Sequence, residues 1–534
     1  MRRWNGWGDD SVQQRLPASA AAYITEHLGT LDPPPDAELE DTLHSVPPSR
    51  LPKLPAWSLD AHDRLLHARG QSLPDWVALR SGRIESFPDA VAYPTDNSHL
   101  SELLRLADLH DLQLIPYGGG TSVVGHINPL PEPRSVTVDM RGMAGLEGLD
   151  TVSGLASFGA GTAGPEIEAT LAEHGFTLGH FPQSFEYSTL GGWIATRSSG
   201  QQSDGYGRIE DLFRGGEIVS PSGALEFAPL PASATGPDLR QLVLGSEGRL
   251  GFITRAVVRV RRKPEEEVFL SVLFPDWSSG VDAARHAAQR DLPLSMFRLS
   301  DALETTFSLA SAGRPRLRSL AESLLSLIGF DDEKCLAIYA LSGPQSTANE
   351  GRRHARRLFR RHGGLSIGGW LGERWRRSRF QTPYLRNSLW DLGYAVDSME
   401  TAFTWDQIDN GRNRILEALN HASTGANRTL VLSHLSHRYT DAASLYFTLL
   451  FRRSSDPDRT LANWKQLKRA AVAAILDSGG TISHHHGIGT DHREYLAEEK
   501  GALALRSLEA ARRTFDPQGW LNPGKLLGPA EAGP

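Results

Sequence analysis

Three adjacent histidines, His484, His485 and His486, stand in the segment TISHHHGIGTD, directly before a glycine-containing turn. The unperturbed pKa of imidazole lies near neutrality, so such a run suits proton transfer, and imidazole is also a common metal ligand. In an extended segment successive side chains alternate, so three rings on one strand cannot all bind one ion. No carboxylate or cysteine cluster accompanies the run. We therefore predict no metal site and interpret the histidines as proton carriers; a solvated polar run is the alternative.

Three loops rich in small residues are the second candidate for chemistry. They are PYGGGTS at 116–122, PQSFEYSTLGGWIATRSSG at 182–200 and LGSEGRLGFIT at 244–254. Glycine allows backbone amides to approach a ligand closely and to point at phosphate oxygens. None of the loops matches the dinucleotide fingerprint or the P-loop. Three such loops within one stretch of chain predict a long, diphosphate-containing cofactor.

The composition narrows the class of protein. A chain of 534 residues predicts two or more domains, and a net charge of -7 argues against a nucleic-acid partner. Cys335 is the only cysteine, in an apolar run that predicts a buried strand, which excludes an internal disulfide. No stretch has the length of apolar residues that a membrane helix needs, MRRWNGWGDD lacks the apolar part of a signal peptide, and GPAEAGP is not a peroxisomal signal. We expect a cytoplasmic protein.

The elements that position these motifs fall into four segments. Residues 1–84 are rich in proline and predict an arm with a helix at 18–28 that wraps the protein rather than building its core. Residues 85–264 alternate short strands and helices as an α+β domain, and residues 265–480 predict a two-layer α/β domain. Residues 481–534 carry the histidines and are expected to return to the first domain. A basic helix within 351–364 is interpreted as a solvated face.

The ordered set PYGGGTS, FEYSTLGGWIATRSSG, YGRIEDL and GSEGRLGFIT resembles the flavin-binding domain of the vanillyl-alcohol oxidase and p-cresol methylhydroxylase superfamily. Together with RWNGWG, PYLRN, SLYF, HHHGIG and NPGKLL, it makes nearly the whole chain similar to the alkyldihydroxyacetonephosphate synthase family. The resemblance implies an α+β fold, with an FAD-binding domain of the p-cresol methylhydroxylase type at 85–264 and an α/β cap for the substrate. The cofactor would be noncovalent FAD, because Tyr117 precedes the glycines and His126 falls beyond them.

The resemblance also implies which residues contact FAD. They are Pro116, Tyr117, Gly118, Gly119, Gly120, Thr121, Ser122, Gln183, Ser184, Phe185, Glu186, Tyr187, Ser188, Thr189, Thr196, Arg197, Ser198, Ser199, Glu247, Gly248, Arg249, Leu250, Gly251, Phe252 and Ile253.

By the same resemblance, Tyr446 in SLYF is a catalytic proton donor and acceptor, and the three histidines lie on the substrate side of the flavin. Arg386 in PYLRN would hold a substrate phosphate and Arg298 would support the site. Read alone, Tyr446 is a core residue and Arg386 a surface residue. The chain departs from the family just before the tyrosine, where SHLSHRYTD replaces a sequence close to CRVTQTYD and puts His434 near the place of an arginine.

Two activities are compatible with these residues. The resemblance implies exchange of the acyl group of acyl-dihydroxyacetone phosphate for a fatty alcohol, whereas His434 and the GIG turn fit equally an FAD-dependent dehydrogenase or oxidase of a 2-hydroxy acid or glycerol 3-phosphate. A non-catalytic flavin-binding protein is a third hypothesis, disfavoured by the histidine, tyrosine and arginine set. The expected partner is thus a lipid-phosphate or hydroxy-acid substrate. Peripheral membrane contact through 352–361 and a homodimer are further expectations.

Overall fold

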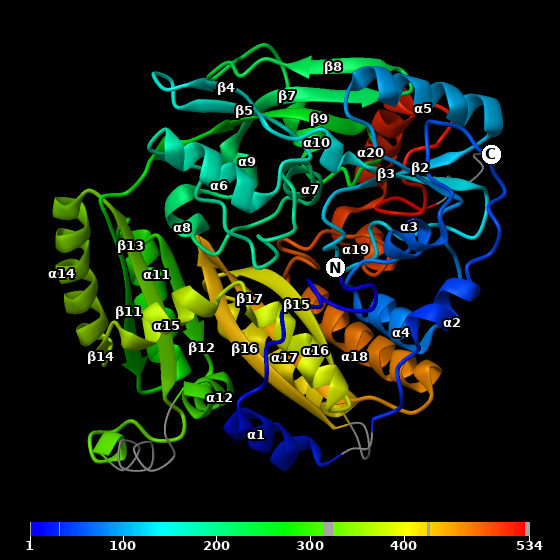
Figure 1. Cartoon of the computed structure of the whole chain (residues 1–534). Coiled ribbons are helices and arrows are strands. Elements are labelled where there is room, and N and C mark those ends of the chain that lie inside the picture. Colours follow the sequence, from blue (N-terminus) through cyan, green and yellow to red (C-terminus); the bar gives the residue numbers. More distant parts are fainter. Residues whose placement is uncertain (1, 31–32, 313–323, 424–427, 529–534) are drawn as a thin grey trace.

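The computed structural model describes residues 2–30, 33–312, 324–423 and 428–528 (Figure 1). The last six residues of the predicted C-terminal tail lie outside this range. Two β-rich halves face each other in Figure 1, with the short helix α7 (Leu190–Thr196) on the side of the upper half that faces the lower one.

The upper half contains a parallel sheet in the order β1-β3-β2 and an antiparallel sheet in the order β4-β5-β9-β7-β8. Apolar residues of α6, α7 and α9, among them Ile167, Trp193 and Ile209, pack on the five-stranded sheet and form one hydrophobic core. The bounds of these elements are β1 (Ala90–Ala92), α5 (Asn97–His110), β2 (Gln113–Tyr117), β3 (Ser135–Asp139), β4 (Leu146–Asp150), β5 (Leu155–Gly159), α6 (Gly164–Glu173), β6 (Phe176–Thr177), α8 (Ser203–Tyr206), α9 (Ile209–Leu212), β7 (Phe213–Ser220), β8 (Gly223–Phe227), α10 (Arg240–Val243), β9 (Phe252–Arg259) and β10 (Arg261–Arg262).

The lower half is built on a seven-stranded antiparallel sheet in the order β14-β11-β13-β12-β16-β17-β15. Its elements are β11 (Glu266–Phe274), α11 (Trp277–Gln289), β12 (Met296–Ser300), α12 (Ala302–Ala312), β13 (Cys335–Gly343), α14 (Gln345–Arg361), β14 (Leu365–Gly368), α15 (Trp370–Ser378), α16 (Leu385–Asp391), β15 (Tyr394–Thr404), α17 (Ile408–Ala422), β16 (Thr429–Arg438) and β17 (Ala442–Arg452). Cys335 is buried and free, as its apolar run predicts.

Strand alternation in β17 separates the core from the cavity described below. Leu445, Phe447 and Leu449 are fully buried in the core that the sheet shares with α17 and α18 (Pro457–Asp477). The intervening Tyr446 and Thr448 line the cavity on the opposite face. Because side chains of a strand alternate, the apolar packing of one face directs Tyr446 into the cavity.

The N-terminal segment departs from its prediction. The helix predicted at 18–28 is present as α1 (Ala18–Leu28), but α2 (Leu39–His44), α3 (Ala61–Leu66) and α4 (Leu73–Ser81) follow it. The expectation that this segment wraps without building a core is wrong, because Leu73 and Trp76 are completely buried in the main hydrophobic core. The indole of Trp76 packs on that of Trp390, with ring centroids 5.7 Å apart.

The C-terminal segment connects the two halves. After α18 the chain forms the histidine loop, then α19 (Leu496–Lys500) and α20 (Ala502–Phe515), drawn in red beside the upper half in Figure 1. Leu521 then pairs in parallel with Leu114 of β2. The histidine loop therefore lies between two elements that are anchored in opposite halves.

Helix α14 buries its apolar face and exposes its basic face to solvent. Ala348, Ala355 and Phe359 are buried, while Arg352 and Arg356 are exposed. The basic face is thus solvated, as the sequence suggested. Among the described residues no helix combines the length and apolar character needed to cross a bilayer.

Candidate active site

One large cavity, of about 1130 Å³, lies between the glycine-rich loops and the seven-stranded sheet. It has room for a dinucleotide-sized cofactor and a substrate, since ordinary small-molecule sites measure roughly 300–1,000 Å³. From the upper half it is lined by Pro116, Tyr117, Gly118, Gly119, Gly120, Thr121, Ser122, Gln183, Ser184, Ser188, Thr189, Thr196, Ser198, Ser199, Glu247, Gly248, Gly251 and Ile253, all of which were predicted to contact the cofactor.

The remaining predicted cofactor residues lie outside this lining. They are Phe185, Glu186, Tyr187, Arg197, Arg249, Leu250 and Phe252. Phe185 and Phe252 are buried in hydrophobic cores, and the guanidinium of Arg249 donates to the carbonyl of Leu521. The hydroxyl of Tyr187 bonds that of Tyr384 at 2.8 Å. These side chains hold the loops in place.

The glycine loops approach each other at backbone distance. A Cβ on Gly119 would lie 1.8 Å from the carbonyl oxygen of Tyr187, so the first and second loops cannot pack in this way around any larger residue. Within the described structure, the buried hydroxyl of Ser199 has no hydrogen-bond partner although the residue lines the cavity. This wall of the cavity presents backbone and small polar groups, as a phosphate-containing ligand requires.

Glu247, which lines the cavity, also contacts the histidine loop. Its carboxylate accepts hydrogen bonds from the amides of Ile488 at 2.6 Å and Gly489 at 2.9 Å, and it lies 3.1 Å from Nε2 of His126. The third glycine loop thus anchors the GIG turn behind the histidines. Gly489 is required there, because a Cβ would lie 2.0 Å from the carbonyl oxygen of Val124.

The histidine run is not a strand. One carboxylate oxygen of Glu400, in β15, accepts hydrogen bonds from the amides of His484, His485 and His486 at 3.2, 2.9 and 2.7 Å, and from the Ser483 hydroxyl at 2.8 Å. Three consecutive amides converge on one oxygen, which bends the chain and ends the alternation expected of an extended segment. The statement that no carboxylate accompanies the histidines is therefore wrong, because Glu400 is distant in sequence but adjacent in space.

Two further residues near the run were not predicted. His437 lies at the end of β16, where the pairing with β17 shifts register between Leu435 and Arg438, and it lines the cavity. Its ring stacks on that of His484 with centroids 5.2 Å apart. The hydroxyl of Tyr439 bonds Nε2 of His484 at 2.6 Å. SHLSHRYTD has no local signal for this placement, because regular alternation would point His434 and His437 to opposite faces.

Tyr446, predicted to be catalytic, lies on the same wall as His434 and Arg298, which were predicted to bind the substrate. His434 and Tyr446 are cross-strand partners whose rings stack at 5.0 Å, and Tyr446 also lies within 5.8 Å of the His486 ring. Glu304 receives a hydrogen bond from Arg298 at 2.7 Å and lies 3.2 Å from Nδ1 of His434. Glu304 therefore holds both residues in position.

Arg386, predicted to hold a phosphate, projects from α16 into the cavity. Its guanidinium lies over the Trp76 ring at 4.4 Å and donates one hydrogen bond to the Gln71 carbonyl. Nε and the second terminal nitrogen are buried and have no hydrogen-bond partner among the described residues. The reading of Arg386 as a surface residue is wrong, because the N-terminal segment covers it. A buried guanidinium with two unpaired nitrogens is stabilised when an anion accepts their hydrogen bonds.

Burial determines which of the ionisable side chains that line or adjoin the cavity are charged. It raises the pKa of Tyr446 to about 12, so the phenol is neutral. Burial and then the charge of Arg208 lower the pKa of His437 to about 3, and burial holds the pKa of His484 and His485 well below the usual value. Burial likewise lowers the pKa of Arg386, to about 10. At neutral pH the wall thus combines a phenol that can donate a proton, imidazoles that can accept one, and a fixed cation.

Comparison with known proteins identifies the class of protein to which this fold and cavity belong. Residues 88–227 match the family described as FAD binding domain, and residues 263–526 match the family described as FAD linked oxidases, C-terminal domain. The solved structure of p-cresol methylhydroxylase with substrate bound shares the fold, with a TM-score of 0.67 at 13% identity over 95% of this chain and 96% of that chain. The predicted α+β fold is confirmed.

The comparisons and the backbone wall agree on the cofactor. The glycine loops and the unpartnered Ser199 hydroxyl fit FAD, so the protein is an FAD-dependent enzyme. An alkyldihydroxyacetonephosphate synthase of Dictyostelium discoideum is 30% identical over 98% of this chain and 93% of its own length. A solved alkyldihydroxyacetonephosphate synthase matches with a TM-score of 0.84 at 29% identity over 98% of both chains. The chain belongs to the alkyldihydroxyacetonephosphate synthase family, as its motifs predicted.

Proposed function

We propose that this protein exchanges the acyl group of acyl-dihydroxyacetone phosphate for a fatty alcohol. The observation that carries the proposal is the Arg386 guanidinium, which is buried, faces the cavity and leaves two nitrogens unpaired. A bidentate anion such as phosphate satisfies both nitrogens at once. The synthase family of the chain supports the same substrate class.

An apolar part of the cavity supports a lipid substrate. Leu16, Val396, Leu432 and Leu450 line it where β15, β16 and β17 meet the N-terminal segment. An alkyl chain buried there gains about 0.8 kcal/mol per methylene. A phosphate bound at Arg386 and a chain in this apolar part would place the ester carbon between them.

The side-chain wall supplies the proton transfers of this reaction. The ester oxygen leaves with the fatty acid as a carboxylate, the alcohol oxygen forms the new C–O bond, and the alcohol proton must be removed, with no net oxidation. His485, which burial keeps neutral, and the adjacent His486 are the proposed proton acceptors, and neutral Tyr446, stacked at 6.2 Å from His485, is suited to donate one. FAD supplies, when bound, the electron-pair chemistry that no side chain offers.

FAD is proposed to be noncovalent. Nδ1 of His126, the histidine next to the first glycine loop, lies 2.8 Å from the Ser122 hydroxyl, and Nε2 faces Glu247. Nδ1 thus contacts a hydroxyl and Nε2 points at a carboxylate of the protein, which supports a histidine that forms no bond to the flavin.

The second candidate is an FAD-dependent dehydrogenase or oxidase of a 2-hydroxy acid or glycerol 3-phosphate. The observation that favours it is His434, which lines the cavity beside Tyr446 and is oriented by Glu304. A neutral imidazole held in this way suits removal of a hydroxyl proton. The match to FAD linked oxidases is compatible with it.

The surroundings of the enzyme are also proposals. The solvated basic face of α14 supports peripheral contact with anionic lipid, and the lone buried Cys335 suits the cytoplasm. The family resemblance supports a homodimer.

Anaerobic flavin spectroscopy tests the two activities on one sample. Palmitoyl dihydroxyacetone phosphate should perturb the oxidised flavin spectrum and, with a fatty alcohol, release palmitate, whereas glycerol 3-phosphate and D-2-hydroxy acids leave the spectrum intact. Bleaching by glycerol 3-phosphate or a hydroxy acid, without palmitate release from the acyl substrate, establishes the dehydrogenase and removes the synthase proposal.

A further inference from the structure

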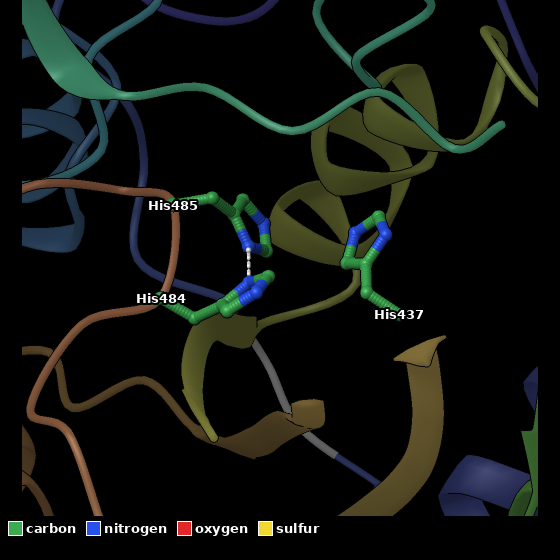
Figure 2. Close-up of side chains that lie close together, drawn as sticks. All are labelled: His437, His484 and His485. Atoms are coloured by element: carbon green, nitrogen blue, oxygen red, sulfur yellow. Dashed lines mark hydrogen bonds between the residues drawn. The ribbon is translucent and has the colours of Figure 1, made fainter. Parts of the chain in front are cut away.

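Three histidine rings from two distant segments face one another beside the cavity (Figure 2). His437 comes from β16, and His484 and His485 come from the bent histidine loop. Nδ1 of His484 and Nδ1 of His485 are 2.9 Å apart, and one nitrogen of each of the three rings lies within 4.8 Å of the others.

The spacing of the rings is that of a three-histidine metal site. Ring centroids are 5.2 Å apart for His437 and His484, 5.2 Å for His484 and His485, and 5.8 Å for His437 and His485. In a tetrahedral site with metal–nitrogen distances of about 2.0–2.1 Å, ring centres lie about 5 Å from one another. The three rings therefore form a nearly equilateral triangle of the required size.

The surroundings of the triangle complete the arrangement. The hydroxyl oxygen of Tyr439, 2.6 Å from Nε2 of His484, can accept a hydrogen bond from Nε2–H and leave Nδ1 free as a ligand, which is the usual role of an outer partner. His437 and His485 line the cavity, so the fourth position opens toward solvent or substrate. Arg208, which donates to the His484 carbonyl at 2.7 Å, opposes a cation, whereas Glu400 favours one.

A second group of possible ligands, Glu400, His485 and His486, is less suitable. One oxygen of Glu400 is engaged by three amides and a hydroxyl, and the other lies 3.1 Å from Nδ1 of His486, so a metal at this group would have to displace that contact. A metal at the three-histidine group leaves the contact between Glu400 and His486 intact and replaces the contact between Nδ1 of His484 and Nδ1 of His485.

We propose that His437, His484 and His485 form a binding site for one borderline divalent transition metal ion, such as Zn²⁺ or Co²⁺, with its fourth position open to the cavity. This differs from the prediction of no metal site, which assumed an extended run without neighbouring ligands. A bound ion occupies the lone pairs of His484 and His485. This consequence rests on the proposed function: by occupying His485, one of the two proposed proton acceptors, the ion should inhibit turnover.

Metal binding is measured on the full chain with FAD bound, after treatment with a chelator. Isothermal titration with Zn²⁺ should give one ion per chain, and Co²⁺ should give the ligand-field absorption of a tetrahedral site. His437→Ala should abolish the tetrahedral spectrum, and Tyr439→Phe should weaken affinity about 10- to 100-fold. His62→Asn is the matched control, because it disrupts the partly exposed group Asp60, His62 and Asp63, and it should leave the spectrum unchanged.

Two results overturn the proposal. The first is absence of stoichiometric binding in the wild type. The second is an unchanged Co²⁺ spectrum in His437→Ala, and if that spectrum is lost in His486→Asn, the ion belongs to the Glu400 group. FAD content verifies the fold of each variant, and His437→Gln replaces His437→Ala if the alanine variant loses flavin. The readout requires no turnover, so failure of the proposed function leaves this test intact.

Discussion

The upper wall of the cavity is built from backbone, whereas the lower wall is built from ionisable side chains. On the upper wall Gly119 meets the carbonyl of Tyr187 with no room for a Cβ, and on the lower wall Tyr446, His434 and the histidine loop present acids and bases. The upper wall should therefore be sensitive to added volume and the lower wall to changed chemistry at constant volume.

The largest effect is expected from chemistry on the lower wall. Tyr446→Phe removes only the hydroxyl that we propose as proton donor, so kcat should fall about 10²- to 10⁴-fold while FAD remains bound. The measurement is release of fatty acid from the acyl substrate. Tyr339→Phe, a buried tyrosine of the same sheet outside the cavity lining, is the control. Equal rates in the two variants would remove Tyr446 from the mechanism.

Added volume on the upper wall should abolish cofactor binding. Gly119→Ala places a Cβ against the Tyr187 carbonyl at 1.8 Å, so the two loops must separate. Overpacking costs about 1–3 kcal/mol, which corresponds to a loss of FAD affinity of about 5- to 160-fold. Flavin per chain, measured by absorbance after gel filtration, is the readout. Gly148→Ala meets open space and should retain full flavin. A fully loaded Gly119→Ala protein would contradict the backbone role.

Loss of the fixed cation should act on substrate binding. Arg386→Met keeps the stem but removes the charge, and a hydrogen bond to a charged group contributes about 1.5–3 kcal/mol, so KM for the phosphate substrate should rise roughly 10- to 150-fold. Arg64→Met tests a buried arginine outside the cavity lining, bonded to the Pro88 carbonyl. If both variants show the same KM, Arg386 does not bind the phosphate.

The smallest effect is expected on the pH dependence of the free energy of unfolding. Between about pH 3 and 6.5 the unfolded chain binds a proton at His437 that the folded protein does not. The free energy of unfolding is therefore unaffected by His437 above pH 6.5 and falls by about 1.4 kcal/mol for each pH unit below it. Asp491 acts oppositely, because burial raises its pKa to about 7.

Urea unfolding at pH 5 and pH 7.5 measures this contribution. His437→Gln should remove one titrating group from the pH dependence of the free energy of unfolding, whereas substitution of the half-buried His62 by Asn should leave that dependence unchanged. An identical slope in wild type and His437→Gln would show that His437 is protonated in the folded protein.

Much of the fold could be predicted from local patterns. The strand containing Cys335 and the helix at 18–28 follow from apolar runs and helix-forming composition, and the glycine loops follow from small residues that no packed element needs. The burial of Trp76 in the core could not be predicted, because its partner Trp390 is more than 300 positions away. The proline-rich segment around Trp76 also has no local pattern that indicates a core element.

The sequence by itself determined the class of cofactor, the family and the alternation that turns Tyr446 away from the apolar face of β17, because these depend on residue type and short spacing. Only the tertiary structure decided how the histidines are used. Glu400 bends their loop from 84 to 86 positions away, and a register shift in β16 brings His437 to His484. Contacts at such separations depend on how sheets and loops pack, and no local pattern records them.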